Sequence, residues 1–266
     1  MSTPSERLGA TLHRAYVDAD AIDVASLPPS MTVEDGYAVQ QDFVARRVPD
    51  EGTVAGYKIG CTNEAVQSDI GVDEPVYGCV LEGTIRWERQ FEVDSLIEPR
   101  IEPEIAFILG DDLDRSADRL DVLSATRFVV PVIEVVDSRI EDWDLTAPAA
   151  IADNALAARL LPGGRAGTEK TDFPLEAVEV LINGERRATG TGAAVLGHPA
   201  DAVAWLADTL SDHGDTLQAG EIVTTGSLTE PIPVGPGDTI VTRFSSLGTV
   251  LAQATSATGG STCREG

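Results

Sequence analysis

The sequence predicts an α+β protein in which a helical N-terminal part precedes a β-rich remainder. Before residue 50, apolar residues recur at helical spacing, whereas most later segments read as strands separated by glycine-, proline- and asparagine-containing turns. The chain shows no alternating strand–helix–strand array and no glycine-rich loop of the nucleotide-binding kind. The pattern therefore does not indicate a doubly wound nucleotide-binding fold.

Two helices are expected in the N-terminal part. The segment 4–20 carries leucine and alanine at helical spacing, which predicts the first helix. After a proline-containing break, Thr32 and Asp35 stand at the positions of a capping box, with aspartate in place of the usual longer acid. The second helix is therefore expected to follow Thr32 and to continue to about Arg47, where Pro49 ends it.

A buried strand is predicted at 53–60, and it contains one charged residue, Lys58. In the simplest interpretation, Lys58 is an ordinary strand lysine that keeps its ammonium group in water. Alternatively, it is a cation directed at an anionic ligand, a role that suits a compact charge able to move a proton when desolvated. The chain contains only two lysines, Lys58 and Lys170, so retaining one inside an apolar strand favours the second interpretation.

Two glutamates share one face of the strand predicted at 101–109. Every odd position of this segment is apolar, and side chains two apart on a strand point the same way, so Glu102 and Glu104 lie side by side. Neighbouring carboxylates repel each other, and in an apolar strand they lose hydration unless a cation or a proton neutralises them. The pair is therefore either the solvated face of a half-exposed strand or part of a site for a divalent metal ion.

A third glutamate, Glu134, interrupts the most strongly β-forming stretch of the chain, 128–137. The length and apolar character of this stretch indicate a strand that is buried on both faces. A buried carboxylate without a partner is unfavourable, so Glu134 requires one. An arginine would serve, and so would a metal ion shared with Glu102 and Glu104.

The rest of the chain is expected to contain further strands and short helices. Asn183-Gly184, between the segments 177–182 and 185–189, is a strong signal for a β-hairpin. Pro199 is expected in the first turn of a helix, at whose start His198 either caps the helix, packs, or faces a site. Further helices are predicted at 62–67, at 118–127 and within 148–160, and further strands near 84–87 and at 221–226, 238–244 and 248–254.

The composition is strongly acidic, with 44 Asp and Glu against 19 Lys and Arg and a formal net charge of −25. An acidic excess with almost no lysine fits a protein kept soluble at high salt, where screening weakens self-repulsion, and we interpret it as a halophilic adaptation. The lack of a basic footprint argues against nucleic-acid binding.

Location follows from cysteine usage and from the apolar runs. The three cysteines show no metal-binding or redox spacing, which indicates a reducing cytoplasm. The N-terminal residues contain no basic region followed by an apolar run, so no signal peptide is expected. No apolar stretch is long enough to span a membrane.

Several motifs occur in an order that is specific for one family. They are Gly56-Tyr57-Lys58-Ile59-Gly60, Gly71 to Pro75 with Tyr77-Gly78, Glu102-Pro103-Glu104, Ile133-Glu134 with Asp137-Ser138-Arg139, Ala152-Asp153-Asn154-Ala155, Leu196-Gly197-His198-Pro199, Gly220 with Thr225-Gly226, and Gly237-Asp238. The ordered set runs from about residue 5 to residue 254 and resembles the 2-oxopent-4-enoate hydratase/4-oxalocrotonate decarboxylase family, within the fumarylacetoacetase superfamily.

The resemblance implies a mixed β-sheet roll or barrel of the fumarylacetoacetase C-terminal type, with the N-terminal helices packed on it. We accordingly divide the chain into an N-terminal helical and α+β subdomain at 1–80, a β-rich catalytic domain at 81–254 and a flexible tail at 255–266. A homo-oligomer is also expected.

The resemblance further implies a Mg²⁺ or Mn²⁺ site formed by Glu102, Glu104 and Glu134, with Lys58 as the catalytic lysine. These four residues are the ones that the strand patterns single out, and an all-oxygen site suits a hard cation. The residues expected to bind the substrate are Lys58, Ile59, Tyr77 and Ser227.

The activity implied by the resemblance is metal-dependent addition of water to a 2-hydroxy-2,4-dienoate or 2-oxo-4-enoate of the 2-oxopent-4-enoate type, in the catabolism of aromatic compounds. Alternatives are a 4-oxalocrotonate decarboxylase, an acylpyruvate hydrolase and a non-catalytic partner subunit. Three positions depart from the pattern of many relatives, because Val76 replaces an aspartate and Leu156 and Ala157 replace serines. By resemblance these positions lie near the substrate, so they bear on which substrate is used.

Overall fold

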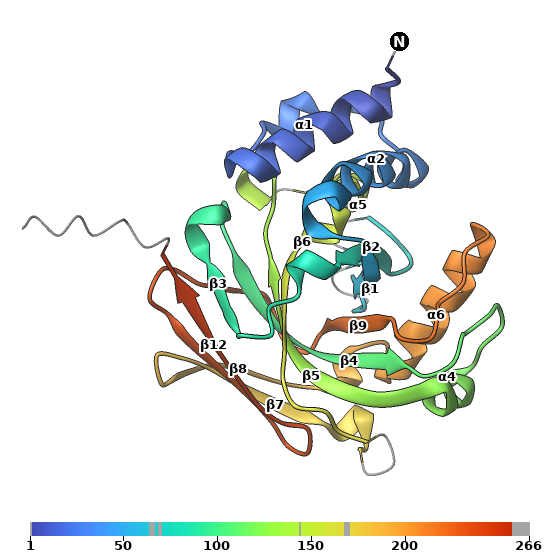
Figure 1. Cartoon of the computed structure of the whole chain (residues 1–266), viewed down its shortest axis with the longest axis vertical. Coiled ribbons are helices and arrows are strands. Elements are labelled where there is room, and N and C mark those ends of the chain that lie inside the picture. Colours follow the sequence, from blue (N-terminus) through green and yellow to red (C-terminus); the bar gives the residue numbers. More distant parts are fainter. Residues whose placement is uncertain (1, 64–66, 69–70, 144, 168–170, 257–266) are drawn as a thin grey trace, which may run out of the picture.

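The computed structural model describes residues 2–63, 67–68, 71–143, 145–167 and 171–256. Its helices are α1 (Pro4–Asp18), α2 (Val33–Glu51), α4 (Arg119–Ala125), α5 (Ala147–Ala152) and α6 (Pro199–Asp212). Its strands are β1 (Val54–Gly60), β2 (Val76–Leu81), β3 (Gln90–Glu92), β4 (Arg100–Leu109), β5 (Thr126–Val136), β6 (Ala157–Pro162), β7 (Ala177–Ile182), β8 (Glu185–Thr191), β9 (Ile222–Ser227), β10 (Ile232–Pro233), β11 (Thr239–Phe244) and β12 (Gly248–Thr255). Figure 1 shows an α+β fold, which confirms the predicted fold class.

The strands form two mixed sheets. The larger sheet has the order β2-β1-β9-β4-β5-β6, with β10 paired to β4, and β1 runs parallel to β9. The smaller sheet has the order β3-β12-β11-β7-β8, with β3 parallel to β12. Figure 1 shows the long strand β5 strongly curved, so the larger sheet curls and does not lie flat.

A hydrophobic core lies between the two sheets. Ile101 of β4 and Ile133 of β5 pack in one buried cluster with Val180, Ile240 and Val250 of the smaller sheet. Because side chains alternate along a strand, the neighbouring even-numbered side chains of β4 and β5 point away from this core. One face of the β4–β5 pair therefore holds the sheets together, and the opposite face carries the acidic residues.

The N-terminal helices pack over the β1–β2 end of the larger sheet (Figure 1), which confirms their predicted placement. Leu12 of α1 and Phe43 of α2 are fully buried in one cluster with Ala149 of α5. The buried side chain of Gln40 ties α2 to its neighbours, because its Nε2 atom donates to the carbonyl oxygens of Tyr77 at 2.9 Å and Ile151 at 3.0 Å.

Helix α2 does not end at Pro49 as predicted, but continues to Glu51. A proline near the end of a helix removes only one late hydrogen bond, so the final turn can survive. Arg47 pairs with Glu51 at 2.8 Å across that turn, and Gly52, with φ 80°, donates its N–H to Val48 and ends the helix.

One other predicted segment is wrong. The segment 84–87 is not a strand, since Glu82–Thr84 forms a 3₁₀ turn and Ile85 makes a single bridge to Leu160. The helix expected within 148–160 forms in part, since α5 ends at Ala152 and left-handed backbones at Asn154–Leu156 turn the chain into strand β6. Alanine favours helices, but this tertiary turn overrides the local preference.

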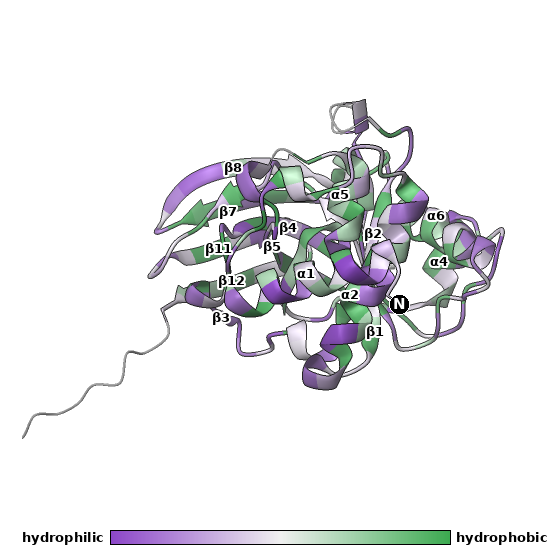
Figure 2. Cartoon of the chain, turned by 90° about the horizontal axis from the view of Figure 1, so that it is seen from above, coloured by the Kyte–Doolittle hydropathy of each residue, from purple (hydrophilic) through white to green (hydrophobic). Residues whose placement is uncertain are grey.

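The β7–β8 hairpin at Asn183-Gly184 confirms its sequence signal. Strand β8 is the polar outer edge of the smaller sheet, visible as a mostly purple ribbon in Figure 2. The predicted helix at 62–67 lies partly outside the described residues, as does most of the tail. The division of the chain at residue 80 stays a prediction. No helix in the described part of the chain combines the length and apolar character needed to cross a membrane.

Candidate metal centre and adjoining cavity

Three glutamates meet on one face of the larger sheet. The strand register places Glu102 of β4 directly opposite Glu134 of β5, and Glu104 follows two residues later on the same face of β4. One carboxylate oxygen from each residue lies within 4.8 Å of the others. A single antiparallel strand pair therefore assembles the three carboxylates that the sequence patterns single out.

Burial perturbs all three carboxyl groups. Glu104 and Glu134 are 0% and 2% exposed, and Glu102 is half-buried. Loss of hydration raises the pKa of Glu102 to about 7, although nearby Lys58 opposes the shift. Burial, reinforced by the charge of Glu134, raises the pKa of Glu104 well above its usual range, and burial also raises the pKa of Glu134. The cluster is therefore unfavourable as three bare carboxylates.

Two carboxylate oxygens lack a hydrogen-bond donor among the described residues. Glu104 Oε2 accepts from the N–H of Gly226 at 3.0 Å, but Glu104 Oε1 has no donor within the described part of the chain. Glu134 Oε2 lies 3.3 Å from Lys58 Nζ, which is an ion-pair distance without the alignment of a hydrogen bond. Buried polar atoms normally have partners, and three carboxylates form the all-oxygen set that Mg²⁺ prefers. The residues present therefore fit a hard divalent cation.

Lys58 reaches the cluster from β1, which is separated from β4 by the single strand β9. Its Nζ atom also donates to the carbonyl oxygen of Ala155 at 3.0 Å. Burial lowers the pKa of Lys58, but the charges of Glu134, Glu102 and Glu104 outweigh this effect and raise it. Lys58 therefore stays charged beside the carboxylates at neutral pH.

The Ala155 carbonyl belongs to a turn with an unusual backbone. Asn154, Ala155 and Leu156 have φ angles of 54°, 47° and 64°, in the left-handed region that non-glycine residues rarely adopt. The Asn154 side chain clamps β2, since Cys79 N donates to its Oδ1 at 2.8 Å and its Nδ2 donates to Cys79 O at 2.9 Å. A Cβ at Gly78 would lie 2.3 Å from Asn154 O, so only glycine allows this approach.

A buried ion pair anchors the same turn at its other end. Arg139 and Asp153 are both 0% exposed, and Arg139 donates from Nε to Asp153 Oδ1 at 2.5 Å and from its backbone N–H to Oδ2 at 2.9 Å. Burial raises the pKa of Asp153 to about 6 despite the charge of Arg139. The turn is thus held from two sides, which fixes the carbonyl that receives the Lys58 hydrogen bond.

A cavity of about 590 Å³ opens beside the glutamates, and we call it the glutamate cavity. It is lined by Lys58, Ile59, Gly60, Cys61, Thr62, Asn63, Val76, Arg100, Glu102, Val136, Trp143, Leu145, Ala150, Ala155, Leu156, Ala194, Ser227, Leu228, Thr229, Glu230 and Pro231. Of the residues predicted to bind metal or substrate, Lys58, Ile59, Glu102 and Ser227 are in this lining. Glu104 and Glu134 are almost fully buried next to it.

Tyr77 lies outside the lining that the described residues form. Its ring stacks on Tyr37 with centroids 4.7 Å apart and meets Tyr57 edge-on at 6.1 Å. Val76 lines the cavity, and because side chains alternate along β2, the ring of Tyr77 points to the opposite side. The placement of Tyr77 favours packing over the contact with substrate that was predicted.

The lining includes residues that the sequence patterns did not single out, notably Arg100, Trp143 and Glu230. The position of Arg100, two residues before Glu102 on one strand, is a signal that strand alternation could have supplied. The loop residues Trp143 and Glu230 have no comparable local signal. Of the positions that depart from the family pattern, Val76 and Leu156 line the cavity.

His198 caps helix α6, which is one of the three roles that the sequence analysis leaves open for it. Its Nδ1 atom accepts from the N–H of Ala200 at 3.1 Å at the start of α6, and its ring packs edge-on against Phe173. His198 is not among the described residues that line the glutamate cavity. It is therefore not placed to activate a water molecule there.

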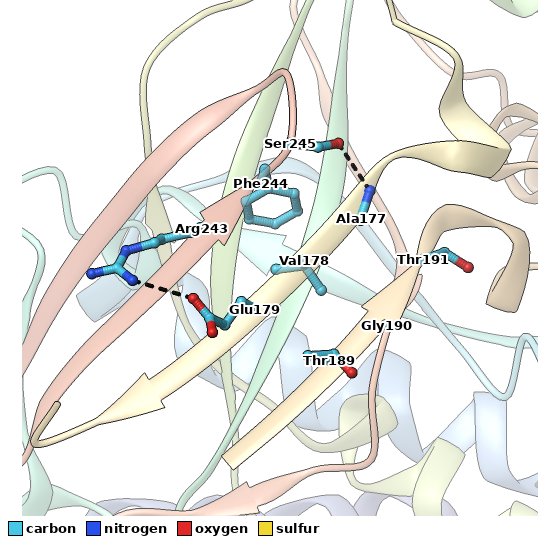
Figure 3. A pocket seen from close by; sticks show the side chains of 9 residues that line it. All are labelled: Ala177, Val178, Glu179, Thr189, Gly190, Thr191, Arg243, Phe244 and Ser245. Atoms are coloured by element: carbon cyan, nitrogen blue, oxygen red, sulfur yellow. Dashed lines mark hydrogen bonds and ion pairs between the residues drawn. The ribbon is translucent and has the colours of Figure 1, made fainter. Parts of the chain in front are cut away.

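A second cavity, of about 640 Å³, lies on the smaller sheet, away from the glutamates. Figure 3 shows its lining, which comes from β7, β8, β11 and Ser245, the residue after β11. Its two charged side chains, Glu179 and Arg243, pair with each other at 3.2 Å, and Ser245 Oγ accepts from the N–H of Ala177. Because these polar groups already have partners, we place the candidate site in the glutamate cavity.

Comparison with known proteins places this site in context. The family model for the C-terminal domain of fumarylacetoacetate (FAA) hydrolase matches residues 80–254. The chain is 36% identical over 248 residues to the 4-oxalocrotonate decarboxylase of Pseudomonas sp. (strain CF600), covering 90% of this chain and 94% of that protein. It is 37% identical over 261 residues to the 2-hydroxyhexa-2,4-dienoate hydratase of Comamonas testosteroni, covering 96% and 97%.

A solved structure shares the architecture. The 4-oxalocrotonate decarboxylase from Pseudomonas putida G7, complexed with magnesium and adipate, superposes with a TM-score of 0.90 at 34% identity, covering 96% of this chain and 99% of that chain. Hydratases and decarboxylases thus resemble this chain to nearly the same degree.

Proposed function

Since the chain belongs to the fumarylacetoacetate (FAA) hydrolase family, we propose that it is a metal-dependent hydratase for a 2-hydroxy-2,4-dienoate or 2-oxo-4-enoate of the 2-oxopent-4-enoate type. One observation carries the proposal. One carboxylate oxygen from each of three glutamates lies within 4.8 Å of the others beside a cavity, with a charged lysine among them. The two almost fully buried members, Glu104 and Glu134, each have an oxygen without a donor among the described residues. A structural subunit has no need of such an unfavourable cluster, which argues against the non-catalytic alternative.

Glu102, Glu104 and Glu134 would hold the metal ion. A bound Mg²⁺ or Mn²⁺ ion would act as a Lewis acid that stabilises negative charge on an enolate oxygen of the substrate. A relative's structure contains magnesium, which supports this choice of metal.

Lys58 has two tasks available to it. As a charged ammonium group in the cavity wall, it can pair with the carboxylate of the substrate, and it can also transfer a proton to or from the carbon skeleton. The Ala155 carbonyl oxygen fixes the direction of the Lys58 ammonium group, because it accepts a hydrogen bond from one of the three N–H donors of that group. Apolar lining such as Ile59, Val76 and Leu156 limits water around Lys58 and strengthens its electrostatic interactions.

The apolar lining favours a second candidate, the 4-oxalocrotonate decarboxylase reaction. Adding water to a double bond requires polar groups that position the water molecule. Val76 and Leu156 stand in the lining where many relatives carry polar residues, and loss of CO₂ from the substrate needs no such groups. Acylpyruvate hydrolysis has less support, because His198 is engaged as a helix cap.

Turnover with defined substrates tests the proposal. The purified protein is incubated with Mg²⁺ and each dienoate, while dienol absorbance and CO₂ release are followed. Loss of absorbance without CO₂ supports the hydratase, and release of CO₂ supports the decarboxylase. Lys58→Ala should reduce turnover by about 10²- to 10⁴-fold with metal binding retained. Absence of turnover for every dienoate with Mg²⁺ and with Mn²⁺ would reject both reactions.

A further inference from the structure

Strand β9 carries a buried hydroxyl group that has no hydrogen-bond partner. Thr224 is 0% exposed, and its Oγ1 atom finds neither a donor nor an acceptor among the described residues. The hydroxyl group of the next residue, Thr225, is satisfied, since it donates to the carbonyl oxygen of Ile105 at 3.0 Å. Because buried polar atoms nearly always have partners, the unpaired hydroxyl group of Thr224 requires an explanation.

The strand register places Thr224 on the face of the larger sheet that carries the glutamates. Thr224 is paired with Lys58 of β1 on one side and with Ala106 of β4 on the other. Ala106 follows Glu104 by two residues, so these two side chains lie on one face of β4. Ile222, two residues before Thr224, packs with Ala106 in one buried cluster. Thr224 therefore lies on the same face as Glu104.

Glu104 is the diagonal neighbour of Thr224 across the β4–β9 strand pair. Diagonal neighbours on adjacent strands are about 7–8 Å apart, which is within reach of a long side chain such as glutamate. The strand residues beside this diagonal are Ala106 and Gly226, and neither has a side chain larger than a methyl group. Neither residue therefore separates the Thr224 hydroxyl group from the Glu104 carboxylate.

Glu104 has the complementary deficit. A register shift between Glu104 and Ala106 frees the N–H of Gly226, which donates to Glu104 Oε2 at 3.0 Å. Glu104 Oε1 is buried and receives no hydrogen bond from the residues that the structure describes. Lys58 does not supply one, because its Nζ atom is directed to the Ala155 carbonyl and to Glu134. A hydroxyl group without a partner thus lies diagonally across from a carboxylate oxygen without a donor.

We propose that Thr224 is a positioning residue of the metal centre. Its hydroxyl group donates a hydrogen bond to the Glu104 carboxylate, directly or through one buried water molecule, and orients this carboxylate toward a divalent cation. The inference rests on the proposed function, which assigns Glu104 to the metal site. Carboxylates that bind metal ions are themselves held by hydrogen bonds, and a hydroxyl group that donates to an ionised oxygen forms a strong bond.

Isosteric substitution is the direct test. Thr224→Val keeps the shape of the side chain and removes the hydroxyl group, whereas Thr224→Ser retains the hydroxyl group. Each metal-free protein is titrated calorimetrically with Mg²⁺ and with Mn²⁺. The affinity should be about 10- to 100-fold lower in Thr224→Val and close to that of the wild type in Thr224→Ser, because loss of an outer partner of a metal ligand has an effect of this size.

Thr242 offers a matched control in the smaller sheet. It is also 0% exposed, and its Oγ1 atom also lacks a partner in the described part of the chain, but it lies on β11 between Val180 and Val250. Thr242→Val should therefore leave the metal affinity unchanged. Thermal unfolding without metal should show both valine variants melting at or above the wild-type temperature, because each substitution removes a buried hydroxyl group that has no partner.

Unchanged metal affinity in Thr224→Val, or a loss that Thr224→Ser does not restore, would overturn the inference and leave the metal centre standing. If the wild type binds neither Mg²⁺ nor Mn²⁺, the metal centre is rejected together with the role of Thr224. Absence of turnover with every dienoate, while the affinity difference between Thr224→Val and Thr224→Ser persists, would reject the proposed reaction and support the role of Thr224.

Discussion

The Nζ atom of Lys58 lies 3.0 Å from the carbonyl oxygen of Ala155, 97 residues further along the chain, and 3.3 Å from Glu134 Oε2. The lysine is thus held between a carbonyl and a carboxylate that come from different elements. The carbonyl is supplied by a turn of left-handed residues, which stays in place because Asn154 and the Arg139–Asp153 pair restrain it. Sparsely populated backbone conformations of this kind persist only when their surroundings hold them.

Asn154 should act as a positioning residue for Lys58. Asn154→Ala removes both hydrogen bonds to Cys79, so the turn should loosen. The kcat value should fall about tenfold, which corresponds to a net loss of about 1.4 kcal/mol. The KM value and the metal affinity should change little. Asn154→Gly separates the two possible causes, because glycine tolerates the φ of 54° but lacks the side chain. Normal kcat in Asn154→Gly would show that backbone strain, and not the side-chain clamp, matters.

Glu104→Gln should weaken Mg²⁺ or Mn²⁺ binding by more than about 100-fold, since even outer partners of metal ligands typically contribute 10- to 100-fold. The substitution keeps the size of a fully buried side chain and removes its charge. Calorimetric titration of the metal-free protein measures the effect. Glu230→Gln is the matched control, because Glu230 lines the cavity but is not part of the glutamate cluster. The metal affinity of the Glu230→Gln protein should stay near that of the wild type. Unchanged affinity in Glu104→Gln would remove it from the site.

The stability of the metal-free protein should decrease as pH rises through neutrality. The pKa of Glu102 is about 7 in the folded protein against an ordinary value of 4.5, and the pKa values of Glu104 and Glu134 are also raised. Groups with a raised carboxyl pKa stabilise the folded state fully below the ordinary value, and this contribution is lost as pH rises through the folded value. Lys58 stays charged throughout, because its pKa is raised above an already basic value.

Thermal unfolding between about pH 5 and pH 9 measures this dependence. Added Mg²⁺ should restore stability most strongly at high pH, because it binds the ionised carboxylates and releases protons. Glu102→Gln should flatten the metal-free profile around pH 7. A metal-free melting temperature that rises steadily between pH 6 and pH 8 would contradict the assignment.

The Arg139–Asp153 pair should be important for stability. Asp153→Asn leaves the fully buried Arg139 charge without its counter-ion, so the free energy of unfolding should fall by about 3–5 kcal/mol. The control is Asp201→Asn, which breaks the more exposed Arg119–Asp201 pair and should change stability by no more than about 1 kcal/mol. Urea denaturation measures both variants. Equal small effects would show that Arg139 finds another partner.

Much of the fold was predictable because its signals are local. Helices α1 and α2, strands β4 and β5 and the hairpin at Asn183-Gly184 follow from periodicity, capping and turn chemistry within each segment. Strand alternation likewise placed Glu102 and Glu104 on one face. The exceptions, such as the turn at Asn154 that ends helix α5, arise where contacts between distant residues outweigh local preference.

The sequence by itself determined which carboxylates and which lysine lie in strands that are largely apolar, because side-chain alternation and apolar character are properties of each segment. Only the tertiary structure decided that they meet. The register of β4 with β5 sets Glu134 against Glu102, and the order β1-β9-β4-β5 brings Lys58 to them. The tertiary structure also places Arg100 in the lining of the glutamate cavity and leaves Tyr77 outside the lining that the described residues form. Strand pairing joins residues far apart in the chain, and no local pattern specifies which strands become neighbours.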